Sequence, residues 1–153
     1  MYPGATHTRF EHSIGVMEVA TQAFESIRSD YESKMVMGKV FGTVEGFDEN
    51  PVGKAKQVLR LAALLHDIGH APFCHAAEQV YFKDIPGGHE ALGAEIIRED
   101  LGSLIDGLYW PGYARTIAFI IQGDPSHAIP QFKILCDLIS GEMDSDRTDY
   151  LLR

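Results

Sequence analysis

The sequence has few of the features that mark a disulfide-bonded or membrane-spanning protein. It contains two cysteines, Cys74 and Cys136, which are far apart and form no CxxC pair. This pattern gives no sign of a disulfide framework or a zinc ribbon and is typical of the reducing cytoplasm. No apolar run approaches the ~18 residues of a membrane span. Because the first ten residues lack an apolar centre, we also expect no signal peptide.

Positive charge is also scarce. The chain has 13 Lys and Arg residues against 22 Asp and Glu residues, which gives a formal net charge of -9. Non-specific nucleic-acid binding needs a basic face, so the composition does not support nucleic acid as a partner, although it leaves room for a small basic pocket. An acidic protein that handles phosphates needs metal ions and a few well-placed basic side chains to offset its own field.

Helical patterns dominate what is present, and strand patterns are weak. Residues 8–30 carry apolar side chains at helical spacing, among them Phe10, Ile14 and Phe24. Residues 54–70 are apolar on nearly all sides and predict a central core helix. Residues 38–53 contain four glycines and one proline, and they predict a loop or a short hairpin. Further helices are expected over residues 74–82, 89–99, 112–122 and 131–140, and from residue 144 or 145 onward. The predicted fold class is all-α.

The 153 residues are enough for one domain that buries about two-thirds of its unfolded surface. Met1 is followed at once by motif-like sequence, and Arg153 ends a helix-like segment without a cap. We therefore expect residues 1–153 to form a single domain that is truncated relative to a longer protein.

Three segments carry side chains that can bind a metal ion: residues 9–12 and 66–75 hold histidine together with an acidic residue, and residues 144–150 hold three aspartates. Imidazole and carboxylate together suit a divalent transition metal such as Fe, Mn, Zn, Ni or Co. His66 and Asp67 end the most apolar helix, where polar groups are costly unless they are paired or bind a cation. A less specific interpretation stays open, because a single histidine on an apolar helix is more often a packed core residue. The acidic residues from 144 to 149 could likewise only cap a helix.

The segments YPGATHTRFEHSIGVMEVA, LAALLHDIGHAPFCH and MDSDRTDYLLR resemble the H…HD…D signature of the HD-domain phosphohydrolases. More narrowly, they resemble the deoxynucleoside triphosphate triphosphohydrolase branch, which includes bacterial dGTPases and the eukaryotic SAM-and-HD-domain enzymes. The resemblance covers nearly the whole chain, and RFEHS followed at this distance by LLHDIGHxPFxH is highly specific. It implies a single HD domain, built as a helical bundle around a buried divalent metal ion (Mn, Fe, Mg, Zn, Ni or Co). It also implies a nucleotide substrate and a homo-oligomer.

The resemblance also implies roles for individual residues. Four residues match the metal ligands of the family: His12, His66, Asp67 and Asp146. Three match its catalytic group, with the acid orienting a histidine: His89, His70 and Glu78. Three match its contacts to substrate phosphate and sugar: Arg9, Arg147 and Tyr150.

The reaction implied by the resemblance is hydrolysis at the α-phosphate of a deoxynucleoside triphosphate, which releases deoxynucleoside and triphosphate. Two alternatives stay open. The domain could be an HD phosphohydrolase that acts on another nucleotide, a phosphomonoester or a phosphodiester. It could also be a non-catalytic, metal-bound regulatory module.

Overall fold

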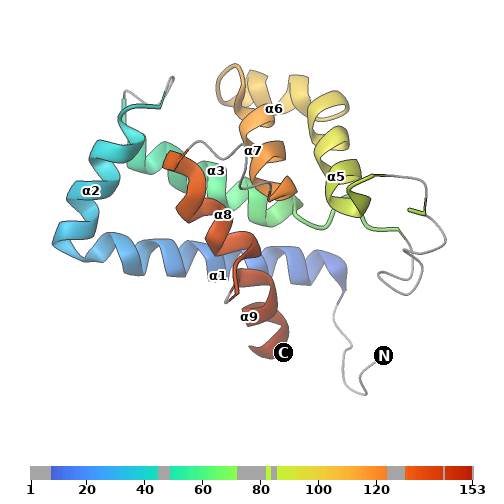
Figure 1. The fold of residues 1–153 in the computed structure, drawn as a ribbon, viewed down its shortest axis with the longest axis horizontal. Helices are drawn as coiled ribbons and strands as arrows, with labels where there is room; N and C mark the ends of the chain where they lie inside the picture. The colour runs from blue at the N-terminus through green and yellow to red at the C-terminus, as the bar shows by residue number, and fades with distance from the viewer. Residues whose placement is uncertain are drawn as a thin grey trace.

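The computed structural model describes residues 8–44, 49–71, 82–83, 86–123, 130–142 and 144–152, and within these ranges every regular element is a helix (Figure 1). The elements are α1 (Arg9–Ser29), α2 (Tyr31–Phe41), α3 (Pro51–Leu65), α5 (Gly88–Glu99), α6 (Gly102–Leu108), α7 (Tyr113–Gln122), the short 3-10 helix η1 (Pro130–Phe132), α8 (Lys133–Ser140) and α9 (Ser145–Leu152). The all-α prediction is confirmed. None of the described helices is long and apolar enough to cross a membrane.

Helix α1 begins with a capping box that fixes its first turn. The Thr8 hydroxyl accepts a hydrogen bond from the Glu11 backbone N–H (3.2 Å), and the Glu11 carboxylate accepts one from the Thr8 N–H (2.6 Å). At the other end, Asp30 closes α1 and caps α2 by accepting from the Ser33 N–H (2.8 Å). A single residue therefore joins the two helices, and Figure 1 shows α2 leaving α1 at a steep angle.

Helix α3 is the predicted core helix, and it lies against α1 (Figure 1). Asn50 caps its start with a left-handed backbone (φ 122°), and Pro51 occupies the first turn. The helix ends at Leu65, earlier than the predicted His70. The His66 side chain explains the early end, because its Nδ1 lies 2.8 Å from the Ala63 carbonyl. In a continuing helix that carbonyl would accept from the N–H of Asp67.

The core lies where α1, α3, α5, α7 and α8 meet. Its largest fully buried side chains are Tyr113, Phe24, Phe41, Leu59, Ile97, Ile117, Ile120 and Leu135. The apolar pattern of α1 predicted Phe10 and Ile14 in this core, and that prediction is wrong: Phe10 is 72% exposed. Core packing on α1 begins only at Val16, because the first turns of the helix carry the polar residues described below.

Two other boundaries differ from the prediction. The loop expected over residues 38–53 is helical at both ends, because α2 continues to Phe41 and α3 starts at Pro51. Met37 and Phe41 are buried, and that burial outweighs the ~1 kcal/mol helix penalty of a glycine such as Gly38. Neither α2 nor α6 was predicted as a helix. The helix expected over residues 74–82 lies outside the described residues, except for Phe82.

Candidate metal centre

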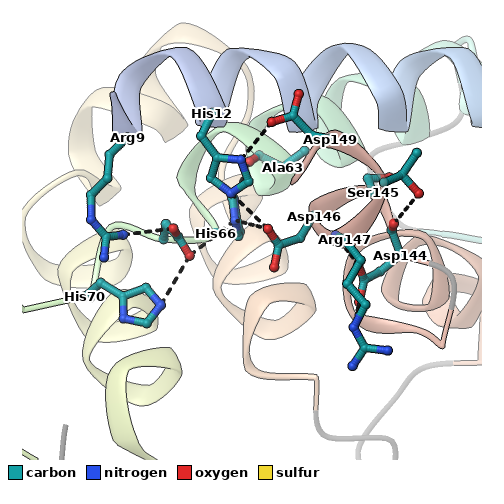
Figure 2. A network of polar contacts seen from close by, with 12 residues as sticks. Arg9, His12, Ala63, His66, His70, Asp144, Ser145, Asp146, Arg147 and Asp149 are labelled. Carbon is teal, nitrogen blue, oxygen red and sulfur yellow. Dashed lines mark hydrogen bonds and ion pairs between the residues drawn. The ribbon is translucent and has the colours of Figure 1, made fainter. Parts of the chain in front are cut away.

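Three helices bring the predicted ligands together (Figure 2). His12 lies in the first turns of α1, His66 and Asp67 follow the last residue of α3, and Asp146 lies in the first turn of α9. Helix α1 packs against both α3 and α9, so the three segments meet beside its N-terminal half. One ligand atom from each of His12, His66 and Asp67 lies within 4.8 Å of the other two.

Asp146 approaches the same point from α9. Its Oδ1 atom lies 2.8 Å from His12 Nε2 and 3.8 Å from His66 Nε2. The shorter contact is a hydrogen bond, whereas the longer one is an electrostatic contact between a carboxylate and an imidazole. Figure 2 shows the Asp146 carboxylate turned toward both rings. All four residues that the resemblance implies as ligands are therefore neighbours.

The orientation of His66 supplies the test of whether a cation fits. Its Nδ1–H donates to the Ala63 carbonyl, so the Nε2 atom carries a lone pair when the ring is neutral. Nε2 is buried and has no hydrogen-bond partner among the described residues, yet Asp67 Oδ1 lies 3.2 Å away and Asp146 Oδ1 3.8 Å away. A buried lone pair beside two carboxylates is unfavourable unless a proton or a cation lies between them. The donor set of imidazole nitrogen and carboxylate oxygen suits a divalent metal ion.

The pKa values of the clustered residues also favour a bound cation. The hydrogen bond to Asp146, together with the contact to Asp149, outweighs burial and raises the pKa of His12 to about 8. Burial lowers the pKa of His66, but Asp146 and the charge of Asp67 more than compensate and raise it. Hydrogen bonding to His12 holds the pKa of the Asp146 carboxyl well below its usual range. The raised pKa values of His12 and His66 show that the carboxylates create a negative potential, which favours positive charge at this point.

Asp67 also contacts residues outside the predicted ligand set. Its Oδ2 forms an ion pair with Arg9 Nη1 (2.8 Å), and its Oδ1 lies 3.4 Å from His70 Nε2. His70 in turn stacks on His89, with ring centroids 3.7 Å apart and planes inclined by 16°. Arg9, His70 and His89 therefore border the cluster, as the resemblance implies.

A close backbone approach holds the two stacked histidines in place. Gly69 lies against the first turns of α5, where a Cβ atom on it would collide with the carbonyl oxygen of His89 and lie 2.5 Å from the Gly93 nitrogen. Only a residue without a side chain allows the turn after α3 to touch α5 this closely. The contact places His89, the second residue of α5, over His70.

The structure does not bring Arg147 to the cluster. Its side chain is 68% exposed, donates to the Glu142 carbonyl (3.2 Å) and lies 3.7 Å from Asp144. Figure 2 shows its guanidinium pointing away from the imidazoles. Tyr150 is exposed on α9, and Glu78 lies outside the described residues. The acid beside His89 within the described part of the chain is Glu90, at 3.4 Å. The implied roles of Arg147, Tyr150 and Glu78 stay predictions.

The sequence analysis missed the role of Asp149, for which it offered only helix capping. Asp149 Oδ2 lies 2.8 Å from His12 Nδ1, and the residue is 5% exposed. The cap of α9 is instead Asp144, which accepts from the Arg147 N–H (2.7 Å). The spacing from Asp146 to Asp149 was the available signal, because positions three apart share one face of a helix.

Comparison with known proteins places these residues in a family. The model of the HD domain family matches residues 9–131. The chain is 31% identical over 153 residues to the uncharacterised protein YwfO of Bacillus subtilis, covering 99% of this chain and 29% of that protein. It is 29% identical over 153 residues to an uncharacterised protein of Methanocaldococcus jannaschii, covering 100% of this chain and 24% of that protein.

A third relative has a named activity. The chain is 29% identical over 165 residues to the deoxynucleoside triphosphate triphosphohydrolase SAMHD1 homolog of Dictyostelium discoideum, covering 100% of this chain and 28% of that protein. The chain thus spans 24% to 29% of the length of these relatives. No solved structure matches it. Because the family model covers most of the sequence, including three of the four clustered residues, the chain belongs to the HD domain family, whose domains bind divalent metal ions and support metal-dependent hydrolysis.

Proposed function

We propose that the chain is the catalytic domain of a phosphohydrolase that converts deoxynucleoside triphosphates to deoxynucleoside and triphosphate. One observation carries the metal-dependent part of this proposal. The imidazoles of His12 and His66 each use Nδ1 for a hydrogen bond within the protein and turn Nε2 toward the Asp146 carboxylate. That arrangement is the one a divalent cation requires of two histidine ligands.

In this proposal, His12, His66, Asp67 and Asp146 hold the metal ion. The ion would polarise a phosphoryl oxygen and acidify a bound water molecule. Arg9 lies beside the cluster with its side chain 42% exposed, and its guanidinium transfers from Asp67 to a substrate phosphate, which it can bind through two parallel hydrogen bonds.

The proton chemistry is assigned to the stacked pair His70 and His89. The His70 ring lies beside Asp67, and the His89 ring stacks on His70 at the border of the cluster. Imidazole exchanges protons near neutral pH, so either ring can accept or deliver a proton during phosphate cleavage. Glu78 is proposed to orient this pair.

The choice of substrate is supported by the relative from Dictyostelium discoideum, which is named as a deoxynucleoside triphosphate triphosphohydrolase and aligns with the whole chain. Arg147 and Tyr150 fit the same proposal as contacts to phosphate and sugar. Both follow Asp146 on α9 within four residues, and both side chains are exposed to incoming ligand.

The test is an assay of the full chain with each deoxynucleoside triphosphate in the presence of Mn²⁺, Co²⁺ or Mg²⁺, with product identification. Inorganic triphosphate and deoxynucleoside are the expected products. Asp67→Asn should lower kcat by at least about 100-fold, since it removes a charged ligand. Asp137→Asn is the matched control: Asp137 is exposed on α8 and pairs with Lys133, so its loss should leave kcat unchanged.

The other outcomes identify the alternatives. Release of pyrophosphate or phosphate, or activity only on a phosphomonoester or phosphodiester, would replace the proposed substrate while keeping the reaction class. Metal binding without hydrolysis of any of these substrates would make the domain a non-catalytic metal-bound module.

A further inference from the structure

We infer that Asp149 is a positioning residue that fixes the ring orientation and tautomer of His12, so that His12 Nε2 is held ready as a metal ligand. The inference rests on the proposed metal role of His12. It assigns to Asp149 a function that is distinct from ligation, because the carboxylate contacts the nitrogen on the far side of the ring.

The direction of the hydrogen bond follows from the chemistry of the two groups. An ionised carboxylate can only accept, so at 2.8 Å the Nδ1 atom of His12 must carry the proton and donate it to Asp149 Oδ2. Nε2 lies 2.8 Å from the Asp146 carboxylate, so in the charged, metal-free ring it carries a proton as well; a bound metal ion would replace that proton and leave the Nδ1–H with Asp149. The Ala63 carbonyl constrains His66 in the same way, so both rings present Nε2 to one point.

The buried carboxylate of Asp149 requires a polar partner that compensates for its removal from water. The residue is 5% exposed, and taking a carboxylate out of water costs several kcal/mol unless a charged or polar partner compensates. Helix capping does not explain it, because Asp149 lies in the middle of α9 and Asp144 holds the cap position. The hydrogen bond from His12 Nδ1 at 2.8 Å compensates for this burial.

Two residues of α9 therefore contact the two ring nitrogens of His12. Asp146 and Asp149 are three positions apart, so their carboxylates project from the same face of the helix. Figure 2 shows them on two sides of the His12 imidazole. An anionic acceptor also makes the opposite nitrogen a stronger base than a neutral carbonyl would, which strengthens its bond to a metal.

The test compares Asp149→Asn with Asp144→Asn in the full chain. Both substitutions replace a buried carboxylate of the same segment by an amide of nearly the same shape, and asparagine at position 144 still caps α9. Affinity for Co²⁺ and Mn²⁺ is measured by titration calorimetry. Asp149→Asn should weaken binding by about 10–100-fold, whereas Asp144→Asn should leave it unchanged. A weakening by Asp144→Asn as large as that by Asp149→Asn would overturn the inference, because the effect would then be a general loss of helix structure.

A second measurement needs no metal. Nitrogen-15 shifts of His12 in the metal-free chain, at a pH where imidazole is neutral, report which nitrogen carries the proton. The expected result is protonated Nδ1 in the wild type and a shift toward protonated Nε2 in Asp149→Asn, whose amide can turn its N–H₂ toward Nδ1.

Two results would overturn the role of Asp149: protonated Nε2 in the wild-type chain, or normal metal affinity in Asp149→Asn. A wild-type chain that binds no metal would instead defeat the proposed function, and the tautomer measurement would still decide the role of Asp149. The two failures are thus distinguishable.

Discussion

At the scale of single residues, the carboxylates beside His12 favour its charged form in the metal-free chain. Its pKa is raised from 6.5 to about 8 by Asp146 and Asp149. A base whose folded-state pKa is raised stabilises the fold fully below its unfolded pKa, and this stabilisation disappears as the pH rises through the folded value. The relevant window therefore runs from about pH 6.5 to just above pH 8.

We predict that the metal-free chain loses up to about 2 kcal/mol of unfolding free energy between pH 6 and pH 9, since the shift from 6.5 to about 8 is worth about 1.4 kcal/mol per unit. Urea unfolding in the presence of a chelator measures this change. His12→Gln should flatten the dependence across the same range. A stability that is constant or rises over this window in the wild type would contradict the assignment.

Protonation of His12 also lowers the metal affinity of the site. A proton and a metal ion compete for His12 Nε2, so the metal affinity should rise with pH and level off above about pH 8.

At the scale of elements, the sequence predicted where helices form better than it predicted which residues pack against them. The apolar run before His66 and the capping residue at position 144 are local signals, and the structure confirms both. The exposure of Phe10 could not be predicted, because periodicity identifies an apolar face but not the partner that covers it. The contact between Asp149 and His12 joins residues 137 positions apart, so the spacing of Asp146 and Asp149 indicated a shared helix face but not the partner of that face.

The contact between the turn after α3 and α5 leads to a prediction about Gly69. A Cβ atom there would meet the backbone of His89 and Gly93, which cannot move without displacing α5. We expect Gly69→Ala to destabilise the fold by roughly 1–3 kcal/mol and to lower activity through the displaced His89. Thermal unfolding and the nucleotide assay together measure both effects.

Gly38→Ala is the control for this substitution. Gly38 lies within α2 with open space where its Cβ would be, so alanine should stabilise the helix by about 0.5–1 kcal/mol. Equal stability changes for the two variants would show that the close approach at Gly69 does not constrain α5.

At the scale of the whole molecule, the candidate metal centre connects three helices that are distant in sequence. An ion held by α1, α9 and the end of α3 binds the folded state and not the unfolded chain. The homo-oligomer implied by the resemblance stays a prediction at this scale, and light scattering of the full chain tests it.

We predict that Mn²⁺ or Co²⁺ at 100 times its Kd stabilises the fold by about 2.7 kcal/mol. For a protein of this size this stabilisation corresponds to a rise in Tm of roughly 5–10 °C, measurable by calorimetry. Asp67→Asn should abolish the rise, and the exposed control Asp137→Asn should retain it. A metal-induced rise that survives Asp67→Asn would place the ion elsewhere.

The separation of 137 positions between His12 and Asp149 also sets an order of events during translation. A ribosome that adds about 5–20 residues per second needs roughly 7–27 s to make the intervening chain. Arg9 and Asp67 are only 58 positions apart, so their ion pair can form well before α9 exists. A nascent chain can therefore pair Asp67 with Arg9 before α9 is made, and among the helices that build the centre α9 is synthesised last.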